Sequence, residues 1–185
     1  MAQAGGNGAT APDAAGIAAA ASQAARRGPP PVHLWNPPFC GDLDMEIRAD
    51  GSWFYLGTPI AREGMVRLFA SVLKREGDRY FLVTPVEKVG LRVIDAPFVA
   101  VDAELDRGNV TFTTNVGETV TAGPGHEIRL TFGPDGTPRP YVHVRRGLDA
   151  LIDRKTYYRL VEAASVEGGD VVLRSGGMDF VLGAA

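Results

Sequence analysis

Alternating apolar and polar residues predict the first strand of this chain. Every second residue over 43–47 is apolar and the residues between them are charged, while an Asp50-Gly51 pair precedes the aromatic run 53–55. Alternation places one set of side chains on a single face of a strand, and an Asp-Gly pair suits a tight turn. We therefore expect a half-buried hairpin over residues 43–55.

The pattern then changes from a period of two to a helical period. Apolar residues recur at i, i+3, i+4, i+7 and i+8, forming the face Met65, Leu68, Phe69, Val72 and Leu73. This spacing is typical of an amphipathic helix, which Gly77-Asp78 would end. Apolar strands are expected on either side of the polar corner 84–88, over residues 80–83 and 91–94.

Strand signals return at Pro97 and continue to the end of the chain. Gly, Asn and Asp clusters separate the apolar runs 98–101, 110–114, 118–121, 128–132, 141–144, 171–173 and 180–182. A second helical face is expected to begin at Leu148, Leu151 and Ile152 and to continue through Tyr158 and Val161. The sequence therefore predicts an α+β fold that is mainly β.

Two passages repeat the same order of parts. A strand, an Asp-Gly turn, a strand, an arginine, a helical face, a Gly-Asp turn and an apolar strand occur twice, about 84 residues apart. This period is far longer than that of a solenoid, so it indicates a duplicated domain. We expect two β-rich halves with a helix each, over residues 32–96 and 97–185.

Residues 1–31 differ in composition from the rest. They contain twelve Ala, five Gly and four Pro. Such a stretch buries too little apolar surface to offset its ordering entropy, so we expect a disordered tail. It lacks the charged and apolar regions of an export signal, and no run of eighteen apolar residues suggests a membrane span. We expect a soluble, cytoplasmic protein.

Charge and cysteine content exclude several classes of partner. The formal net charge is −3, which gives no general attraction to a nucleic-acid backbone. The single cysteine, Cys40, excludes an intramolecular disulfide, and we expect it to be a small buried side chain. No two of the three histidines are three or four residues apart, and no nucleotide, nucleophile-elbow or zinc motif occurs. We therefore predict no catalytic residue, metal site or cofactor.

The polar corner is the first candidate binding element. Thr84, Glu87 and Lys88 offer a hydroxyl, a carboxylate and an ammonium between two apolar strands. Such groups suit hydrogen bonding and phosphate contact. The alternative is a rigid strand connection whose charges are solvated or paired with each other.

Arginines at the expected helix starts are the second candidate. Arg62, Arg145 and Arg146 precede or begin a helical segment in one copy of the repeat. A guanidinium beside backbone donors at a helix N-terminus makes an anion site. If Arg62 and Arg145 are matched across a pseudo-twofold axis, they would share one phosphate. The alternative is a surface charge or a partner carboxylate.

Several ordered motifs resemble one known family. They are DGSWFY at 50–55, GTPIAR at 57–62, LVTPVEK at 82–88, DAPF at 95–98 and YVHVRRGL at 141–148. Over roughly residues 31–183 the chain resembles an uncharacterised bacterial family, domain of unknown function 1285. The resemblance implies a duplicated β-rich core whose second half is superficially like a pleckstrin-homology fold. It also implies a site for a nucleotide-like ligand between the halves and a role in signalling.

These observations favour a non-catalytic, small-ligand-binding regulatory protein with its site between the halves. The first alternative is a module that binds a protein partner through its second half without a small ligand. The second is an enzyme of unrecognised type. A polar cleft between the halves would favour the first hypothesis, and a flat apolar patch would favour a protein partner.

Overall fold

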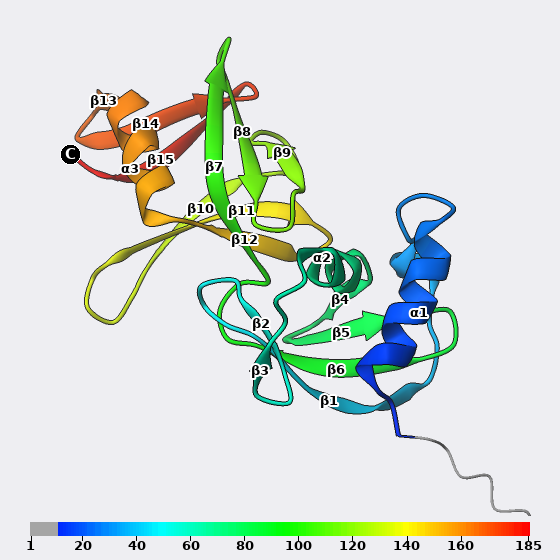
Figure 1. Ribbon diagram of the computed structural model, residues 1–185. Coiled ribbons are helices and arrows are strands. Elements are labelled where there is room, and N and C mark those ends of the chain that lie inside the picture. Colours follow the sequence, from blue (N-terminus) through cyan, green and yellow to red (C-terminus); the bar gives the residue numbers. More distant parts are fainter. Residues whose placement is uncertain (1–10) are drawn as a thin grey trace, which may run out of the picture.

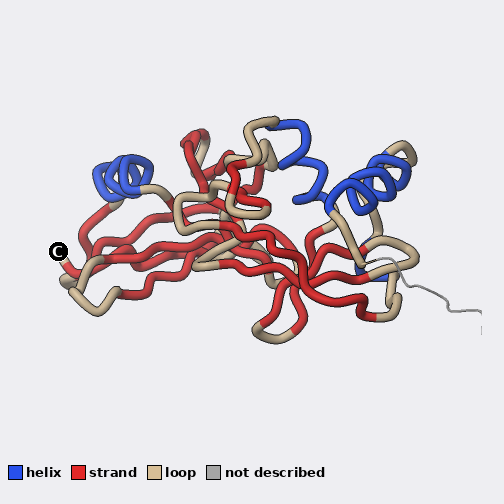
Figure 2. The backbone as a smooth tube through the Cα atoms, turned by 60° about the horizontal axis from the view of Figure 1, so that its bottom comes forward, coloured by secondary structure: helices blue, strands red, loops and turns tan. Residues whose placement is uncertain are grey.

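The computed structural model describes residues 11–185, which form two β-rich halves joined by the segment between Val93 and Phe98 (Figure 1). The first half runs from α1 to β6 and the second from β7 to β15. Figure 2 shows the helices along one side of the strand layer. The fold is mainly β, as the sequence predicts.

The first half is one six-stranded sheet covered by two helices. Its strands lie in the order β3-β2-β1-β6-β5-β4, and β1 pairs with β6 in parallel. Its elements are α1 (Ala14–Ala25), a 3-10 turn (Val32–Leu34), β1 (Phe39–Ile47), β2 (Trp53–Tyr55), β3 (Thr58–Pro59), α2 (Glu63–Ser71), β4 (Leu73–Glu76), β5 (Arg79–Val83) and β6 (Lys88–Val93).

The second half contains a six-stranded and a three-stranded sheet. Their orders are β10-β11-β12-β7-β8-β9 and β13-β14-β15. The elements are β7 (Phe98–Asp106), β8 (Asn109–Thr114), β9 (Thr119–Thr121), β10 (Ile128–Phe132), β11 (Pro138–Arg145), β12 (Leu148–Ile152), α3 (Arg154–Ala163), β13 (Ser165–Glu167), β14 (Asp170–Ser175) and β15 (Met178–Ala184).

The duplication is a unit of three strands, one helix and three more strands. In the first half it is β1–β3, α2 and β4–β6; in the second it is β10–β12, α3 and β13–β15. The first half pairs β1 with β6, and in the second β10 lies against β15. Strands β7–β9 have no counterpart and extend the second sheet beyond β12. Because α2 begins at Glu63 and α3 at Arg154, the helices are offset by 91 residues rather than 84.

The expected hairpin is confirmed, and the first helix is confirmed only over Glu63–Ser71. Its predicted end is wrong, because Leu73 begins strand β4 and Gly77-Asp78 forms the turn between β4 and β5. Ile47 of β1 pairs with Trp53 of β2 in the antiparallel register, and both side chains are buried. Helix α2 buries Phe69, whose ring stacks on Trp53 with 6.2 Å between centroids. The apolar face predicted from the period of 3.6 therefore faces the sheet.

The second predicted helix face is wrong at its start. Leu148, Ala150 and Ile152 are buried at every second position, and they form strand β12. The helix begins only after Asp153, whose carboxylate accepts a hydrogen bond from the backbone N–H of Thr156. A short apolar run fits a strand as well as a helix, and here the alternation of buried residues shows a strand that ends where Asp153 caps the helix.

The expectation of a disordered tail is wrong for α1. Asp13 caps this helix by accepting a hydrogen bond from Gly16 N. The side chains that share its inner face, Ala14, Ile17, Ala18 and Ala21, are buried, and the helix packs beside α2. Alanine methyl groups let two helices approach closely, so a weakly apolar face can pack. Residues 1–10 lie outside the described residues.

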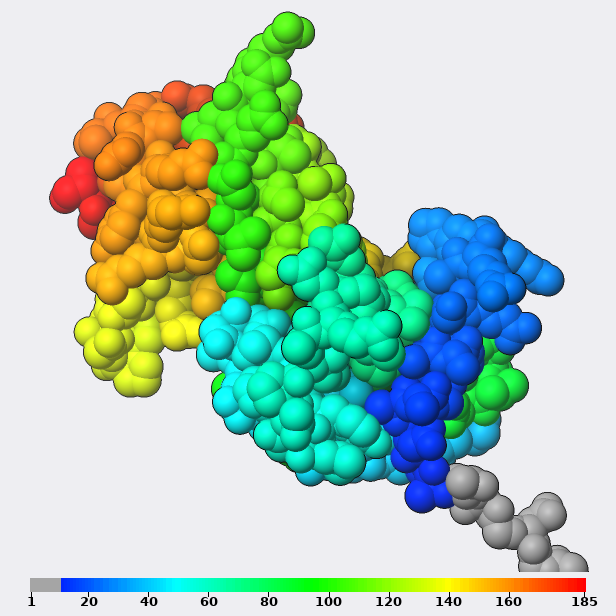
Figure 3. All heavy atoms as spheres, viewed as in Figure 1, coloured from blue at the N-terminus to red at the C-terminus, as the bar shows by residue number. Residues whose placement is uncertain are grey.

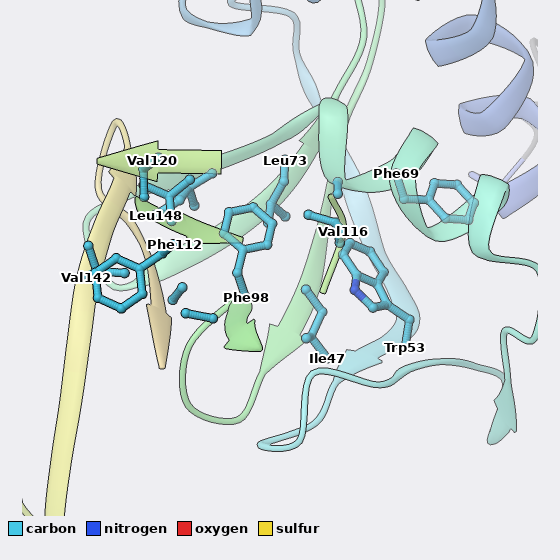
Figure 4. Close-up of a cluster of buried hydrophobic side chains, with 14 of the residues drawn as sticks. Ile47, Trp53, Phe69, Leu73, Phe98, Phe112, Val116, Val120, Val142 and Leu148 are labelled. Carbon is cyan, nitrogen blue, oxygen red and sulfur yellow. The ribbon is translucent and has the colours of Figure 1, made fainter. Parts of the chain in front are cut away.

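One apolar core runs through both halves. Trp53, Phe69 and Leu73 of the first half belong to the same buried cluster as Phe98 and Phe112 of the second. Figure 4 shows Leu73 beside Phe98 and Trp53 beside Val116, where the first half meets the second. Because a shared core resists separation, we expect the two halves to keep a fixed relative position.

The packing of α1 gives a stability prediction. Ile17 is the one large side chain on the inner face of α1 and is fully buried, so Ile17→Ala is expected to lower the free energy of unfolding by about 2–5 kcal/mol. Urea denaturation measures this value. The control is Ile94→Ala, because Ile94 is 57% exposed and its loss should cost less than about 0.5 kcal/mol. Equal costs would show that α1 does not pack.

Candidate functional site

A polar cavity lies where the two halves meet, which we call the seam cavity. Its volume is about 250 Å³. The first half contributes Arg75 and Tyr80, the connecting segment contributes residues 95–97, and the second half contributes Arg129, Thr131, Tyr141 and Asp149. Figure 3 shows the first and second halves in contact along this junction.

Strand pairing brings the second-half residues of the seam cavity together. Arg129 of β10 lies opposite Tyr141 of β11 in the antiparallel register. Strand β11 also pairs with β12, which carries Asp149. Arg129 Nη2 donates to Asp149 Oδ2 at 3.0 Å, and its guanidinium lies 5.2 Å from the centre of the Tyr141 ring. Side chains at alternate positions share one face, so the outer face of this sheet carries the polar wall.

The connecting segment is anchored to the same wall by Asp95. Tyr141 Oη donates to Asp95 Oδ1 at 2.7 Å, and Arg139 pairs with the other carboxylate oxygen. Arg139 Nε also donates to Tyr141 Oη at 3.1 Å. All three side chains are partly or largely buried, so this network fixes the cavity floor.

Arg75 forms the opposite wall and crosses between the halves. Its Nε donates to Gly77 O at 2.9 Å and its Nη1 to Gly147 O at 3.1 Å, while the guanidinium lies over the Tyr80 ring. Within residues 11–185 it has no carboxylate partner. Backbone carbonyl dipoles and the tyrosine ring are the groups that face its charge.

Both tyrosines keep their protons. Burial, the largest cause, raises the pKa of the Tyr80 hydroxyl, and nearby Arg75 opposes this shift. Burial also raises the pKa of Tyr141, with the Asp95 carboxylate adding to the shift and Arg139 opposing it. A protonated phenol donates one hydrogen bond, and Tyr141 already donates its proton to Asp95, so the cavity presents the Tyr80 hydroxyl together with guanidinium groups.

The turn between β11 and β12 holds the halves together beside this cavity. Arg145 forms two hydrogen bonds to Glu118, at 3.0 and 2.8 Å, and its Nη2 also donates to Ala70 O at 2.8 Å. Ala70 lies in the last turn of α2, where a cation is favourable. His143 Nδ1 lies 2.8 Å from Gly125 O, and its Nε2 accepts the backbone N–H of Gly147 at 3.0 Å.

The polar corner predicted as a binding element is a closed turn away from the seam. Thr84 is buried, and its hydroxyl accepts the Glu87 N–H at 3.2 Å. Lys88 pairs with Glu76 at 2.9 Å and its side chain is only 15% exposed. Glu87 is partly exposed and makes no ion pair within residues 11–185. The turn lies beside α1, on the far side of the first half from the seam (Figure 1).

The predicted arginines do not form one site. Arg62 is the exposed N-cap of α2 and makes no side-chain cap bond, and Arg146 is exposed in the β11–β12 turn at φ 43°. Arg145 contacts Ala70 at the other end of α2. Its guanidinium is occupied by Glu118 and by Ala70 O, so it does not face an anion shared with Arg62. The shared-anion hypothesis is wrong, since the residue matching Arg62 before α3 is Asp153.

Sequence reasoning missed Arg75, Tyr80, Arg129 and Tyr141. The sequence places both tyrosines in strands but gives no sign that they belong to a site. The signal that could have revealed the seam cavity is the alternation of side chains, which puts Arg129 and Tyr141 on the same outer face of the sheet. Cys40 is exposed rather than buried. No group of three His, Cys, Asp or Glu side chains in the described part of the chain is arranged to hold a metal ion.

Comparisons with known proteins give one consistent match. The family models "Domain of unknown function (DUF1285), N-terminal domain" and "Protein of unknown function (DUF1285), C-terminal domain" match residues 30–96 and 97–182. A crystal structure of a DUF1285 family protein from Silicibacter pomeroyi DSS-3 is 57% identical, with 91% of this chain and 94% of that chain covered and a TM-score of 0.84.

A second solved structure is more distant. A DUF1285 family protein from Shewanella baltica OS155 is 33% identical, with 66% of this chain and 94% of that chain covered and a TM-score of 0.54. No curated protein matches the chain. Over residues 11–185, none of the helices has the length and apolar character needed to cross a membrane.

The Asp95 network gives a prediction for the cavity floor. Tyr141→Phe removes a hydroxyl that donates to Asp95 and accepts from Arg139, so it is expected to lower the free energy of unfolding by about 1–3 kcal/mol. Urea denaturation measures the change. The control is Tyr158→Phe, because Tyr158 is 51% exposed and its hydroxyl bonds Arg154 at the surface. A Tyr141→Phe cost no larger than that of the control would contradict the network's role.

Proposed function

We propose that this chain, which belongs to the DUF1285 family, is a regulatory protein that binds a small anionic ligand in the seam cavity. The observation that carries the proposal is the charge of Arg75, which has no carboxylate partner within residues 11–185, in a cavity between the halves. Asp95 and Asp149 are each engaged by another arginine, so neither of them neutralises Arg75.

The donors around the cavity suit a phosphate or carboxylate group. Two guanidinium groups and the protonated hydroxyl of Tyr80 line it, and charge-assisted hydrogen bonds to such donors are stronger than neutral ones. The carboxylates of Asp95 and Asp149 also line the cavity and would repel a ligand that carries many negative charges. One singly or doubly charged group is therefore the expected ligand portion.

The volume supports a small ligand. The cavity of about 250 Å³ is slightly below the usual range of roughly 300–1,000 Å³ for drug-sized molecules. It therefore suits one phosphate-bearing end of a larger molecule, and the family resemblance favours a nucleotide. The shared core of the halves supports a preformed site, which lowers the entropy cost of binding.

The two alternatives have less support. Val101 and Leu105 are exposed on the projecting β7–β8 hairpin, which favours a protein partner, but single exposed apolar side chains are common. An enzyme that used a carboxylic acid as its general acid near neutral pH would need a carboxyl group with a raised pKa. The resolved carboxyl pKa shifts within residues 11–185 are all downward, at Asp50, Glu76, Asp102, Glu127, Asp135 and Glu167.

Ligand titrations test the proposal. Inorganic phosphate, nucleoside monophosphates and cyclic dinucleotides are screened by thermal shift, since a ligand at a hundred times its Kd stabilises by about 2.7 kcal/mol. Calorimetry then compares variants below their melting temperatures. Arg75→Ala is expected to weaken binding about tenfold or more, and Tyr80→Phe several-fold, because both remove donors from the cavity.

Arg146→Ala provides the matched control. This arginine lies on the turn beside the cavity but is exposed and does not line it, so its loss should change affinity less than about twofold. The proposal fails if no probe shifts the melting temperature. It also fails if Arg75→Ala binds a hit as tightly as the wild-type protein.

A further inference from the structure

A second and larger cavity lies on the opposite side of the first half. Its volume is about 610 Å³, and it opens between the last turns of α1 and the turn joining β5 to β6, which lie side by side in Figure 1. The lining residues are Ala20, Gln23, Ala24, Arg27, Gly28, Pro29, Pro31, Trp35, Pro85 and Val86. This volume is within the usual range for a small-molecule site.

The walls of this cavity are apolar and preformed. Ala20 and Ala24 carry only methyl groups, so the flank of α1 leaves room that larger side chains would fill. The opposite wall contains Trp35 and Val86, and the side chain of Val86 is 72% exposed. Covering this surface with a hydrocarbon would be favourable, because it removes apolar area from water.

The chemistry of the walls distinguishes a hydrocarbon from a peptide. Pro29, Pro31 and Pro85 have no backbone N–H, so a peptide in the cavity would find few backbone donors for its own carbonyl groups. An alkyl chain has no polar groups to satisfy. Apart from the Trp35 indole, the side-chain donors in the lining are those of Gln23 and Arg27, which lie at the end of α1 and just after it.

Arg27 supplies the charge that selects a head group. It is exposed and forms no ion pair within residues 11–185. The ammonium of Lys74, which contacts Trp35 O, is already paired with Glu76. A planar guanidinium forms two parallel hydrogen bonds with a carboxylate.

We infer that this cavity binds a straight-chain carboxylate, with the alkyl chain against α1, Trp35 and Val86 and the head group on Arg27. The inference is independent of the seam cavity, because the two sites share no lining residue. It gives α1 a function beyond packing, since the helix forms one wall of the site.

Titration of the full chain with decanoate tests the inference. Trp35 lines the cavity and the other tryptophan, Trp53, is buried in the core, so tryptophan fluorescence should change on binding and lose that change in Trp35→Phe. Calorimetry is expected to show affinity rising up to about fourfold for each methylene added from hexanoate to decanoate. Decanol, which lacks the carboxylate, should bind at least about tenfold more weakly than decanoate.

Two pairs of variants separate the site from general effects. Arg27→Ala should weaken decanoate binding about tenfold or more, whereas Arg26→Ala, an exposed neighbour outside the lining, should change it less than twofold. Ala24→Leu fills the cavity and should abolish binding, whereas Ala15→Leu, at an exposed position of α1 outside the lining, should not. Thermal melts check that each variant is folded.

Three results would overturn the inference. They are the absence of decanoate binding to the wild-type chain, equal binding of decanol and decanoate, and binding that survives both Arg27→Ala and Ala24→Leu. None of them bears on the seam cavity, which is tested with phosphate-bearing probes and Arg75→Ala.

Discussion

The guanidinium of Arg145 joins the two halves, and it adds a directional contact to the apolar core that they share. It forms a two-bond pair with Glu118 of its own half and donates to Ala70 O at the C-terminal end of α2 in the other. The side chain is only 24% exposed, so its charge needs both partners. Ala70 O is a favourable acceptor because the C-terminal end of a helix is partially negative.

This contact links the duplicated fold to the candidate site. The turn that follows Arg145 presents Gly147 O to Arg75, and the strands on either side of this turn carry Tyr141 and Asp149. On the other side of the seam, Asn115 donates to Gly51 O, and a side chain at Gly51 would collide with Asn115. Fixed halves therefore hold a polar cavity in which Arg75 faces groups from the second half.

Most strands and the body of α2 were predictable because alternation and helical spacing involve large side chains such as Trp53 and Phe69. Strands β4 and β12 were mistaken for helix, because each lies next to a helix and begins with a leucine that fits the helical spacing. Helix α1 was not predictable, since its inner face has the right spacing but consists of alanine around a single Ile17. The seam cavity was also missed, because tertiary pairing rather than sequence spacing brings Arg75 to Arg129. Arg145 was predicted to contact a ligand, but its partners in the structure are internal, and its match to Arg62 came from a repeat offset that was seven residues too short.

Native-state hydrogen exchange tests most directly whether the two halves unfold as one unit. Amides of β5 and β6 in the first half and of β11 and β12 in the second are followed at increasing urea. The account predicts one shared opening free energy for both sets in the wild-type chain, and two separate values in Arg145→Ala. Separate opening of the two halves in the wild-type chain would contradict it.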